Sequence, residues 1–192
     1  MSRPSNDTPS PAPARASSAA IRSASSAGPV VCGDLDMRIA RDGTWYYRGS
    51  PIARKRLVKL FASVLRREPD GSYYLVTPVE KGLVKVEDAP FVAVEMWREG
   101  DGPAQLLHFR TNLDDHVTAD STHPIRVSHD SVAGQPAPYV LVRGGLEALI
   151  ARSVYYDLVD LGVEIEGNHD HVYGVWSAGI LFPLGRLDAA NS

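Results

Sequence analysis

The densest group of polar side chains lies between Arg110 and Arg126, where carboxylates and imidazoles follow one another within a few residues. Asp114, Asp120 and His123 have the oxygen and nitrogen atoms that divalent cations bind. Their spacing matches neither an EF-hand loop nor the H-E-x-x-H motif. We therefore interpret the stretch as a loop whose aspartates form Asx turns, and we predict no metal site and no other cofactor. A metal-assisted hydrolase built on Asp114, Asp115, Asp120 and His123 stays open as an alternative.

Two Arg-Gly pairs point to a different chemistry. Arg48-Gly49 follows an aromatic strand, and Arg143-Gly144 follows an apolar strand over residues 139–142. We expect a helix to begin just after each pair, so that an arginine lies close to the free N–H groups of a first helical turn. That combination suits phosphate or carboxylate. Two such helix ends facing each other would form a basic cleft for a small anion.

Five further side chains complete the predicted ligand site. Arg110 would contact phosphate, Thr77 and Asn112 would supply hydrogen bonds, Lys81 would reach the cleft from a bend, and Tyr155 would stack on a base. Each also admits a structural role, in surface ion pairs for the cations and in core packing for the tyrosine. The chain lacks the G-x-S-x-G, Walker and G-x-G-x-x-G motifs, so no catalytic residue is predicted and a binding module is favoured over an enzyme.

Two helices are expected to position these side chains. Ser50 is a good N-cap and Pro51 suits the first helical position, which predicts a first helix over residues 51–67. A second helix is predicted over residues 146–161, with Gly162 as its C-cap. The apolar face of the first helix would consist of Leu57, Leu60, Phe61, Val64 and Leu65.

Runs of alternating polarity predict strands on both sides of each helix. The first unit has a hairpin with its turn at residues 41–43, then the helix, then two more strands, in the order ββαββ. The second unit is longer and richer in strand. The predicted strands are residues 37–40, 44–47, 72–77, 83–87, 91–97, 105–111, 124–128, 139–142, 163–166 and 172–182.

The chain is thus predicted to consist of three parts. Residues 1–33 are rich in Ser, Ala and Pro, cannot bury enough apolar surface to fold, and are predicted to be a disordered tail. Residues 34–89 form a smaller α+β domain, and residues 90–192 form a larger, strand-rich α+β domain. The two Arg-Gly pairs are about 95 residues apart, which suggests a duplication of one ββαββ-like unit.

Bulk composition limits the partners and the compartment. The 192 residues have a net charge of −3, which argues against general nucleic-acid binding. The single cysteine, Cys32, rules out an intrachain disulfide and fits a reducing compartment. No run of about 18 apolar residues is present. We therefore predict a cytoplasmic protein whose partners include neither nucleic acid nor a membrane.

Four motifs of the chain resemble those of the bacterial domain-of-unknown-function family 1285, over about residues 35–185. They are Trp45–Ile52, Tyr74–Lys81, Phe109–Asn112 and His123–Val127. The resemblance implies two related α+β domains packed together, the C-terminal one superficially like a pleckstrin-homology fold. It also implies a nucleotide-like ligand where the domains meet, and a role in signal transduction under oxidative stress. The family has no established catalytic residue, so none is carried over.

The leading hypothesis is a module that binds a small anion, nucleotide-like in character, at the domain interface. A protein-interaction adaptor is the second alternative beside the hydrolase. It would use a sheet edge or the basic first helix, because residues 48–67 contain seven Lys and Arg residues and no acidic one.

Overall fold

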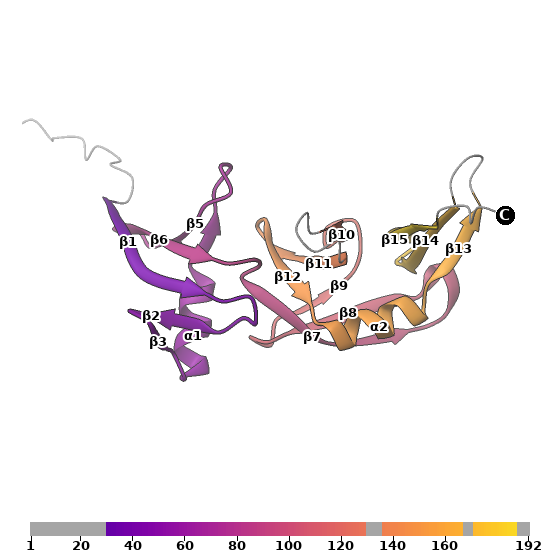
Figure 1. The fold of residues 1–192 in the computed structure, drawn as a ribbon, viewed down its shortest axis with the longest axis horizontal. Helices are drawn as coiled ribbons and strands as arrows, with labels where there is room; N and C mark the ends of the chain where they lie inside the picture. The colour runs from indigo at the N-terminus through magenta and orange to yellow at the C-terminus, as the bar shows by residue number, and fades with distance from the viewer. Residues whose placement is uncertain (1–29, 130–135, 167–170, 188–192) are drawn as a thin grey trace, which may run out of the picture.

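The computed structural model describes residues 30–129, 136–166 and 171–187. Within these ranges the chain forms two six-stranded sheets, one three-stranded sheet and two α-helices. Figure 1 shows the six-stranded sheets next to each other along the long axis of the molecule, with the three-stranded sheet at the far end. The predicted strand-rich α+β organisation in two parts is confirmed.

The N-terminal sheet has the strand order β3-β2-β1-β6-β5-β4. Its central strands β1 and β6 run parallel, and the other neighbours are antiparallel. The hairpin between β1 and β2 turns at residues 41–43, as predicted. The strands are β1 (Val30–Ile39), β2 (Trp45–Tyr47), β3 (Ser50–Pro51), β4 (Leu65–Arg67), β5 (Tyr73–Val76) and β6 (Glu80–Val86).

The first helix, α1 (Lys55–Ser63), is shorter than predicted at both ends. Ser50 and Pro51 are not the N-cap and first turn of the helix but pair with β2 as a short strand, and Arg54 is the N-cap. At the other end, Leu65 is fully buried and pairs with β5. Residues at both ends of the predicted helix therefore pair with neighbouring strands, although helix propensity alone assigns them to the helix.

The buried face of α1 also differs from the prediction. Val58 and Ala62 are buried, whereas Leu57 and Leu60 are 38% and 62% exposed. Phe61 stacks on Trp45 with ring centroids 6.3 Å apart and so holds the helix against the sheet. The predicted apolar face assumed a longer helix. The face that α1 actually buries is turned about the helix axis, from Leu57 and Leu60 toward Val58 and Ala62.

The C-terminal sheet has the strand order β10-β11-β12-β7-β8-β9, and its central strands β12 and β7 run parallel. Strand β9 lies in a stretch predicted to be an irregular polar loop. A 3₁₀ turn, Gly102–Ala104, follows β7. The strands are β7 (Phe91–Glu99), β8 (Leu106–Thr111), β9 (His116–Thr118), β10 (Ile125–His129), β11 (Pro136–Arg143) and β12 (Leu146–Ile150).

The second predicted helix, residues 146–161, is wrong in its first third. Leu146, Ala148 and Ile150 are buried and alternate with partly exposed neighbours, and this segment pairs with β11 and β7 as strand β12. Helix α2 (Arg152–Asp160) begins only afterwards, with Ala151 as its N-cap. Short apolar runs fit both a period of 2 and a period of 3.6, and partner strands decide between them.

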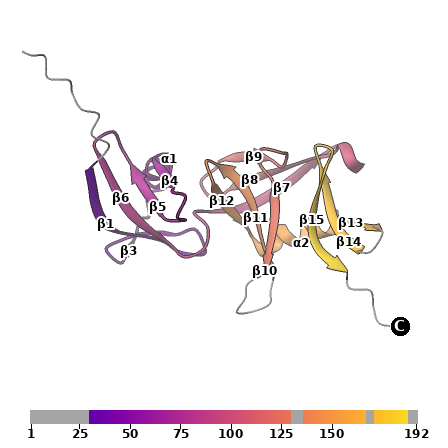
Figure 2. The same cartoon turned by 90° about the horizontal axis from the view of Figure 1, so that it is seen from above.

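The third sheet consists of β13 (Val163–Glu166), β14 (His171–Ser177) and β15 (Ile180–Leu187) in sequence order. The predicted single strand over residues 172–182 is instead a hairpin, which turns at Ala178-Gly179 with φ values of 50° and 76°. The turn predicted at residues 167–170 lies outside the described residues. Strand β15 lies against β10, and α2 lies against β7 and β14 (Figure 2).

The two six-stranded sheets share one topology. In each sheet the first three strands in chain order are neighbours on one side, and the last three are neighbours on the other. The first strand lies parallel to the sixth at the centre. Strands β1–β6 therefore correspond to β7–β12. The predicted repeat paired Arg48 with Arg143, but Arg48 lies in the turn between the second and third strands, whereas Arg143 is the last residue of the fifth strand, β11, just before the turn to the sixth. That pairing is wrong, although a repeated motif is present.

Both domains contribute to one continuous core. Buried residues of the N-terminal sheet, such as Ile39 and Trp45, belong to the same cluster as Phe91 and Phe109 of the C-terminal sheet. The connection between the sheets is short, running from the end of β6 at Val86 to the start of β7. The domains are therefore packed against each other and not only tethered.

The ends of the chain complete the description. Strand β1 begins at Val30, inside the segment predicted as a tail, and the rest of that tail lies outside the described residues. None of the helices in the described ranges is long and apolar enough to cross a membrane. The pleckstrin-homology likeness of the C-terminal domain stays a prediction.

Candidate functional site

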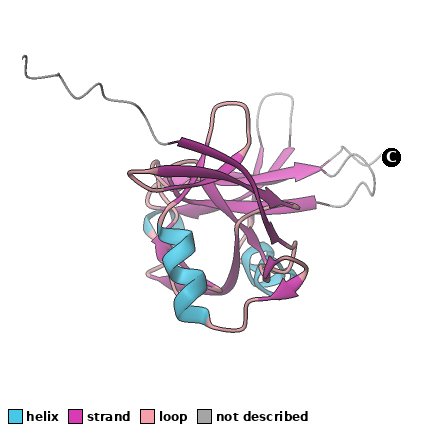
Figure 3. Ribbon diagram, turned by 90° about the vertical axis from the view of Figure 1, so that its left-hand side faces the viewer, coloured by secondary structure: helices cyan, strands magenta, loops and turns pink. Residues whose placement is uncertain are grey.

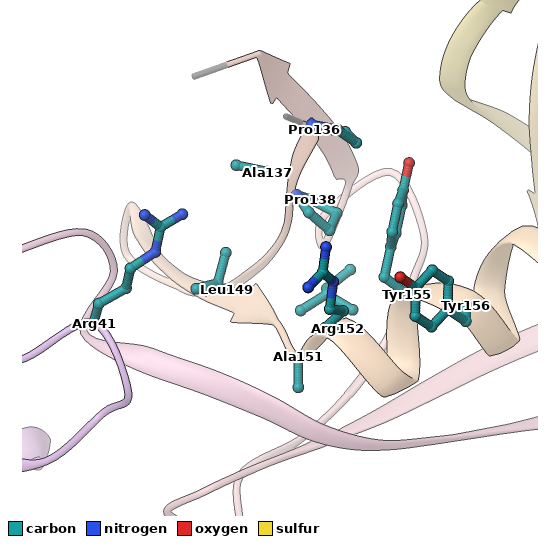
Figure 4. A pocket seen from close by; sticks show the side chains of 10 residues that line it. Arg41, Pro136, Ala137, Pro138, Leu149, Ala151, Arg152, Tyr155 and Tyr156 are labelled. Atoms are coloured by element: carbon teal, nitrogen blue, oxygen red, sulfur yellow. The ribbon is translucent and has the colours of Figure 1, made fainter. Parts of the chain in front are cut away.

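A pocket of about 500 Å³ lies where the turn between β1 and β2 approaches α2 (Figure 4). Arg41 enters it from the N-terminal domain, and the remaining lining residues come from β11, β12 and the start of α2. Its volume falls in the range of about 300–1,000 Å³ that is typical of small-ligand sites. The lining residues that matter for its chemistry are Arg41, Pro138, Leu149, Arg152, Tyr155 and Tyr156.

The N-terminus of α2 forms one side of this pocket. Ala151 is the N-cap and supplies no side-chain hydrogen bond, and the first turn contains no acidic residue. The first N–H groups of the helix have no partner within the helix, so this end attracts negative charge. Arg152, the first residue of the helix, adds a full positive charge at the same place, and it has no ion pair with any residue that the structure describes.

Arg41 is held by the segment that links the two sheets. Its Nε lies 3.1 Å from Oδ2 of Asp88, and its backbone N–H donates to Glu87 at 3.1 Å. The other oxygen of Asp88 accepts a hydrogen bond of 2.7 Å from the Tyr139 hydroxyl. Burial, together with this contact to Asp88, raises the pKa of Tyr139 to about 12, so the hydroxyl stays a donor at neutral pH. The pocket thus adjoins a contact between the linker and the C-terminal domain.

The aromatic side chains supply the apolar part of the pocket. Tyr155 is half-buried, and burial raises its pKa above the ordinary value. Tyr156 is 57% exposed and lies beside it at the pocket edge (Figure 4). Two phenol rings near the Arg152 guanidinium, with Arg41 at the opposite end of the pocket beyond Leu149 (Figure 4), suit a ligand that combines a flat ring with an anion.

Arg143 lies in a second, smaller pocket on the domain interface, lined also by Lys59, Ser63 and Asp114. The prediction that Arg143 lies at a helix N-terminus is wrong, because the segment after it is strand β12. Its guanidinium pairs with Asp115 at 2.9 Å and donates to the Ala62 carbonyl at 3.2 Å. Arg143 therefore ties the C-terminal domain to the end of α1.

Arg48 lies in the turn between β2 and β3 with a φ of 47°. Its N–H donates to the Asp36 carbonyl, and its guanidinium lies over Tyr47 at 5.2 Å. Arg48 and Arg143 share no partner, and neither begins a helix. The predicted geometry of two facing helix ends with their arginines is therefore wrong, because a strand separates each Arg-Gly turn from the following helix.

Arg110 and Asn112 lie in and just after β8, on the C-terminal domain. Arg110 pairs with Glu95 at 2.6 Å. The side chain of Asn112 accepts a hydrogen bond from the Val92 N–H at 3.1 Å and donates to the Gly43 carbonyl at 3.3 Å. Asn112 is thus a bridge between the domains, which gives it a structural role in addition to the predicted one.

Thr77 lies in the turn between β5 and β6, whereas Lys81 lies in β6 and not in the predicted bend, because it pairs with Val31 and Val76 of the neighbouring strands. The Thr77 hydroxyl donates to the Glu80 carbonyl at 3.1 Å and accepts from the Glu80 N–H at 3.0 Å. Lys81 pairs with Glu68 at 3.0 Å and lies over the ring of Tyr74 at 4.2 Å. Of the predicted ligand residues, Tyr155 is in the larger pocket and Arg143 is in the smaller one. The structure does not bring all of them to one place.

The residues of the alternative metal site are engaged in other contacts. Asp114 accepts from Lys55 at 2.7 Å and from Lys59 at 2.8 Å, and these contacts hold its pKa far below the usual range. Asp120 accepts from the N–H of Thr122 at 2.7 Å, which is the expected Asx turn, and from the N–H of His123 at 2.8 Å. Within residues 30–129, 136–166 and 171–187 no three His, Cys, Asp or Glu side chains form a cluster suited to a metal ion.

Two residues of the larger pocket are absent from the predicted site. Arg152 lies at a helix N-terminus because the helix begins there and not, as the sequence predicted, at Leu146. Arg41 was interpreted as part of a turn, and its approach to the C-terminal domain depends on how the two sheets pack. No local sequence pattern encodes this approach of Arg41 to the C-terminal domain.

Two family models match the chain. Residues 25–89 match "Domain of unknown function (DUF1285), N-terminal domain", and residues 90–184 match "Protein of unknown function (DUF1285), C-terminal domain". No curated protein matches it.

Two solved structures are similar to this chain. A DUF1285 family protein from Silicibacter pomeroyi DSS-3 is 50% identical, with 84% of this chain and 85% of that chain covered and a TM-score of 0.77. A second, from Shewanella baltica OS155, is 31% identical, with 66% and 91% covered and a TM-score of 0.51.

Proposed function

The chain belongs to the DUF1285 family, and from the geometry of its larger pocket we propose that it is a binding module for a small phosphate-bearing ligand with a flat ring, such as a nucleotide. The observation that carries the proposal is one pocket that has Arg152, the N-terminus of α2 and Tyr155 at one end and Arg41 at the other (Figure 4). Each of these groups favours one part of such a ligand.

The phosphate would bind at the N-terminus of α2. The free N–H groups of the first turn would donate to its oxygens, and the Arg152 guanidinium would add charge-assisted hydrogen bonds. Arg41 would contribute less, because Asp88 already neutralises part of its charge at 3.1 Å. Hydrogen bonds to charged groups contribute about 1.5–3 kcal/mol each, so Arg152 should account for a tenfold or larger part of the affinity.

The ring would lie against the apolar wall of the pocket. Tyr155, Leu149 and Pro138 provide this wall, and the phenol ring of Tyr155 is the natural stacking surface. Stacking of a base on an aromatic side chain contributes about 1–3 kcal/mol. The ligand would thus contact both domains, through Arg41 on one side and α2 on the other, which suits a role in signal transduction.

The direct test is thermal unfolding of the full chain with a panel of nucleoside mono- and diphosphates and cyclic nucleotides. A ligand at 100 times its dissociation constant adds about 2.7 kcal/mol of stability, which should raise the melting temperature by several degrees. We expect Arg152→Ala to abolish most of this shift, and Arg41→Ala to reduce it less.

The matched control is Arg98→Ala, which removes an exposed arginine of β7 that, among the described residues, forms an ion pair only with Asp101. This variant should behave like the parent protein. A nucleotide-induced shift that survives Arg152→Ala unchanged would place the ligand elsewhere, and a flat response across the panel would reject the proposal.

A further inference from the structure

The two domains have opposite net charges. Residues 34–89 contain 11 basic residues (Lys and Arg) and eight acidic residues (Asp and Glu). Residues 90–192 contain six basic residues and 14 acidic residues. One end of the molecule is therefore positive and the other strongly negative, although the whole chain is only slightly acidic. This asymmetry would attract a second copy in an antiparallel orientation.

The positive charge is concentrated on an exposed face of α1 that also has apolar residues. Arg54 and Arg56 are exposed and have no ion pair with any described residue. Next to them, Leu57 and Leu60 are 38% and 62% exposed. We call these four residues the basic face. Lysines of the same helix already pair with Asp114, so the basic face is what remains available to a partner.

The negative charge has a comparable surface on α2 and the start of β13. Asp157, Asp160 and Glu164 are exposed, and none of them pairs with a cation in the part of the chain that the structure describes. Val163, beside them, is 40% exposed. We call these four residues the acidic face. It complements the basic face in charge, and each face also offers exposed apolar surface.

The two helices are separated along the long axis of the molecule, α1 beside β2 and β3 and α2 beside β7 and β8 (Figure 1). Both lie in the lower half of the view in Figures 1 and 3. The two faces therefore cannot meet within one chain. An antiparallel two-fold pair would bring the basic face of each copy to the acidic face of the other, so that the contact forms twice and the assembly closes.

We propose that the basic face of α1 docks on the acidic face of α2 and β13 of a second copy of this chain, forming an antiparallel dimer. The free arginines and free carboxylates become partners, and the exposed leucines are covered by apolar surface. A stable interface buries about 800 Å² per partner, which a single helical face does not provide and which the doubled contact makes attainable. This inference does not depend on the proposed ligand.

Sedimentation equilibrium of the full chain tests it. At about 0.1 M salt we expect a dimer. At about 1 M salt, where the Debye length falls to about 3 Å, we expect its dissociation constant to rise at least tenfold. Arg56→Glu should weaken the dimer by about tenfold or more, because like charges then face each other. Lys85→Glu is the matched control, since it makes the same charge change on β6 at a residue paired with Asp34.

Charge reversal on the acidic face provides the decisive part of the experiment. Asp160→Arg alone should weaken the dimer as Arg56→Glu does, and an equimolar mixture of the two variants should restore dimers, because one contact is then native and the other has both charges reversed. Monomers at both salt concentrations, equal effects of Arg56→Glu and Lys85→Glu, or no restoration in the mixture would each overturn the proposal. Species larger than a dimer would overturn the two-fold arrangement.

Discussion

At the scale of single residues, charged side chains of this protein fall into two groups. Asp114 and Arg143 have opposite-charge partners close by and help to join the domains. Arg152 and Asp160 have no such partner among the described residues. We expect changes in the first group to affect stability, and changes in the second group to affect binding and association.

Tyr155 provides a test of what the pocket recognises. Tyr155→Phe keeps the ring, whereas Tyr155→Ala removes it. We expect AMP to bind to the Phe variant nearly as well as to the parent and to the Ala variant about tenfold more weakly, since stacking contributes about 1–3 kcal/mol. Inorganic phosphate should bind equally to all three. Titration calorimetry measures each case, and equal losses for phosphate and AMP would mean that Tyr155 acts through the shape of the site.

Asp114 gives the protein a pH-dependent stability. Hydrogen bonds from Lys55 and then Lys59 hold its pKa far below the usual range, so the ionised carboxylate favours the folded state. This contribution is present above about pH 4, the ordinary pKa of an aspartate, and is lost progressively as the pH falls further. Asp114→Asn should therefore lower the melting temperature at pH 7, and the difference from the parent should shrink below pH 4.

The control for this experiment is Asp101→Asn. Its carboxylate is 83% exposed and, within the part of the chain that the structure describes, pairs only with Arg98, so its removal should hardly change the melting temperature at either pH. Asparagine also tolerates the φ of 63° at position 114, so the substitution tests charge and not backbone strain. A gap between Asp114→Asn and the parent that stayed constant from pH 7 to pH 3 would contradict the assignment.

At the scale of elements, sequence patterns predicted most strands but misjudged the helices. Periodicity and turn residues located β2, β5, β6, β7, β8, β10, β11 and β13 to within a few residues, but for β1 they predicted only the last part, because the strand begins at Val30. Residues 50–51 and 146–150 became strands because neighbouring strands were available to pair with them, which no local pattern records. The same error affected the predicted ligand site. Arg143 was chosen for a helix start that lies nine residues later, at Arg152.

The turn between β1 and β2 lies where the domains meet, and two glycines test its role. Gly43 and Gly49 have φ values of 81° and 78°, so alanine is strained at both. A Cβ at Gly43 would lie 2.4 Å from Nδ2 of Asn112, whereas a Cβ at Gly49 meets nothing within 4 Å. Gly43→Ala should therefore cost about 1–3 kcal/mol more in unfolding free energy than Gly49→Ala.

Urea denaturation of both variants measures this difference. Equal losses would mean that Asn112 moves aside without cost and that its contact with the Gly43 carbonyl contributes little to joining the domains. A larger loss for Gly43→Ala would establish this turn as part of the interface that also positions Arg41.

At the scale of the whole molecule, two sheets of one topology form a single core, and the proposed ligand pocket lies between them. Arg41 reaches the pocket from one sheet while its partner Asp88 contacts Tyr139 of the other. The position of Arg41 therefore depends on the packing of the domains, and the pocket would be incomplete in either domain alone. This dependence explains why the site was not predictable from local motifs.

A crystal structure of the full chain grown with AMP tests the central claim most directly. We predict the phosphate at the first turn of α2, within hydrogen-bonding distance of Arg152, with the adenine ring against Tyr155. AMP in the smaller pocket beside Arg143, or elsewhere with the pocket of Arg152 left empty, would contradict the account.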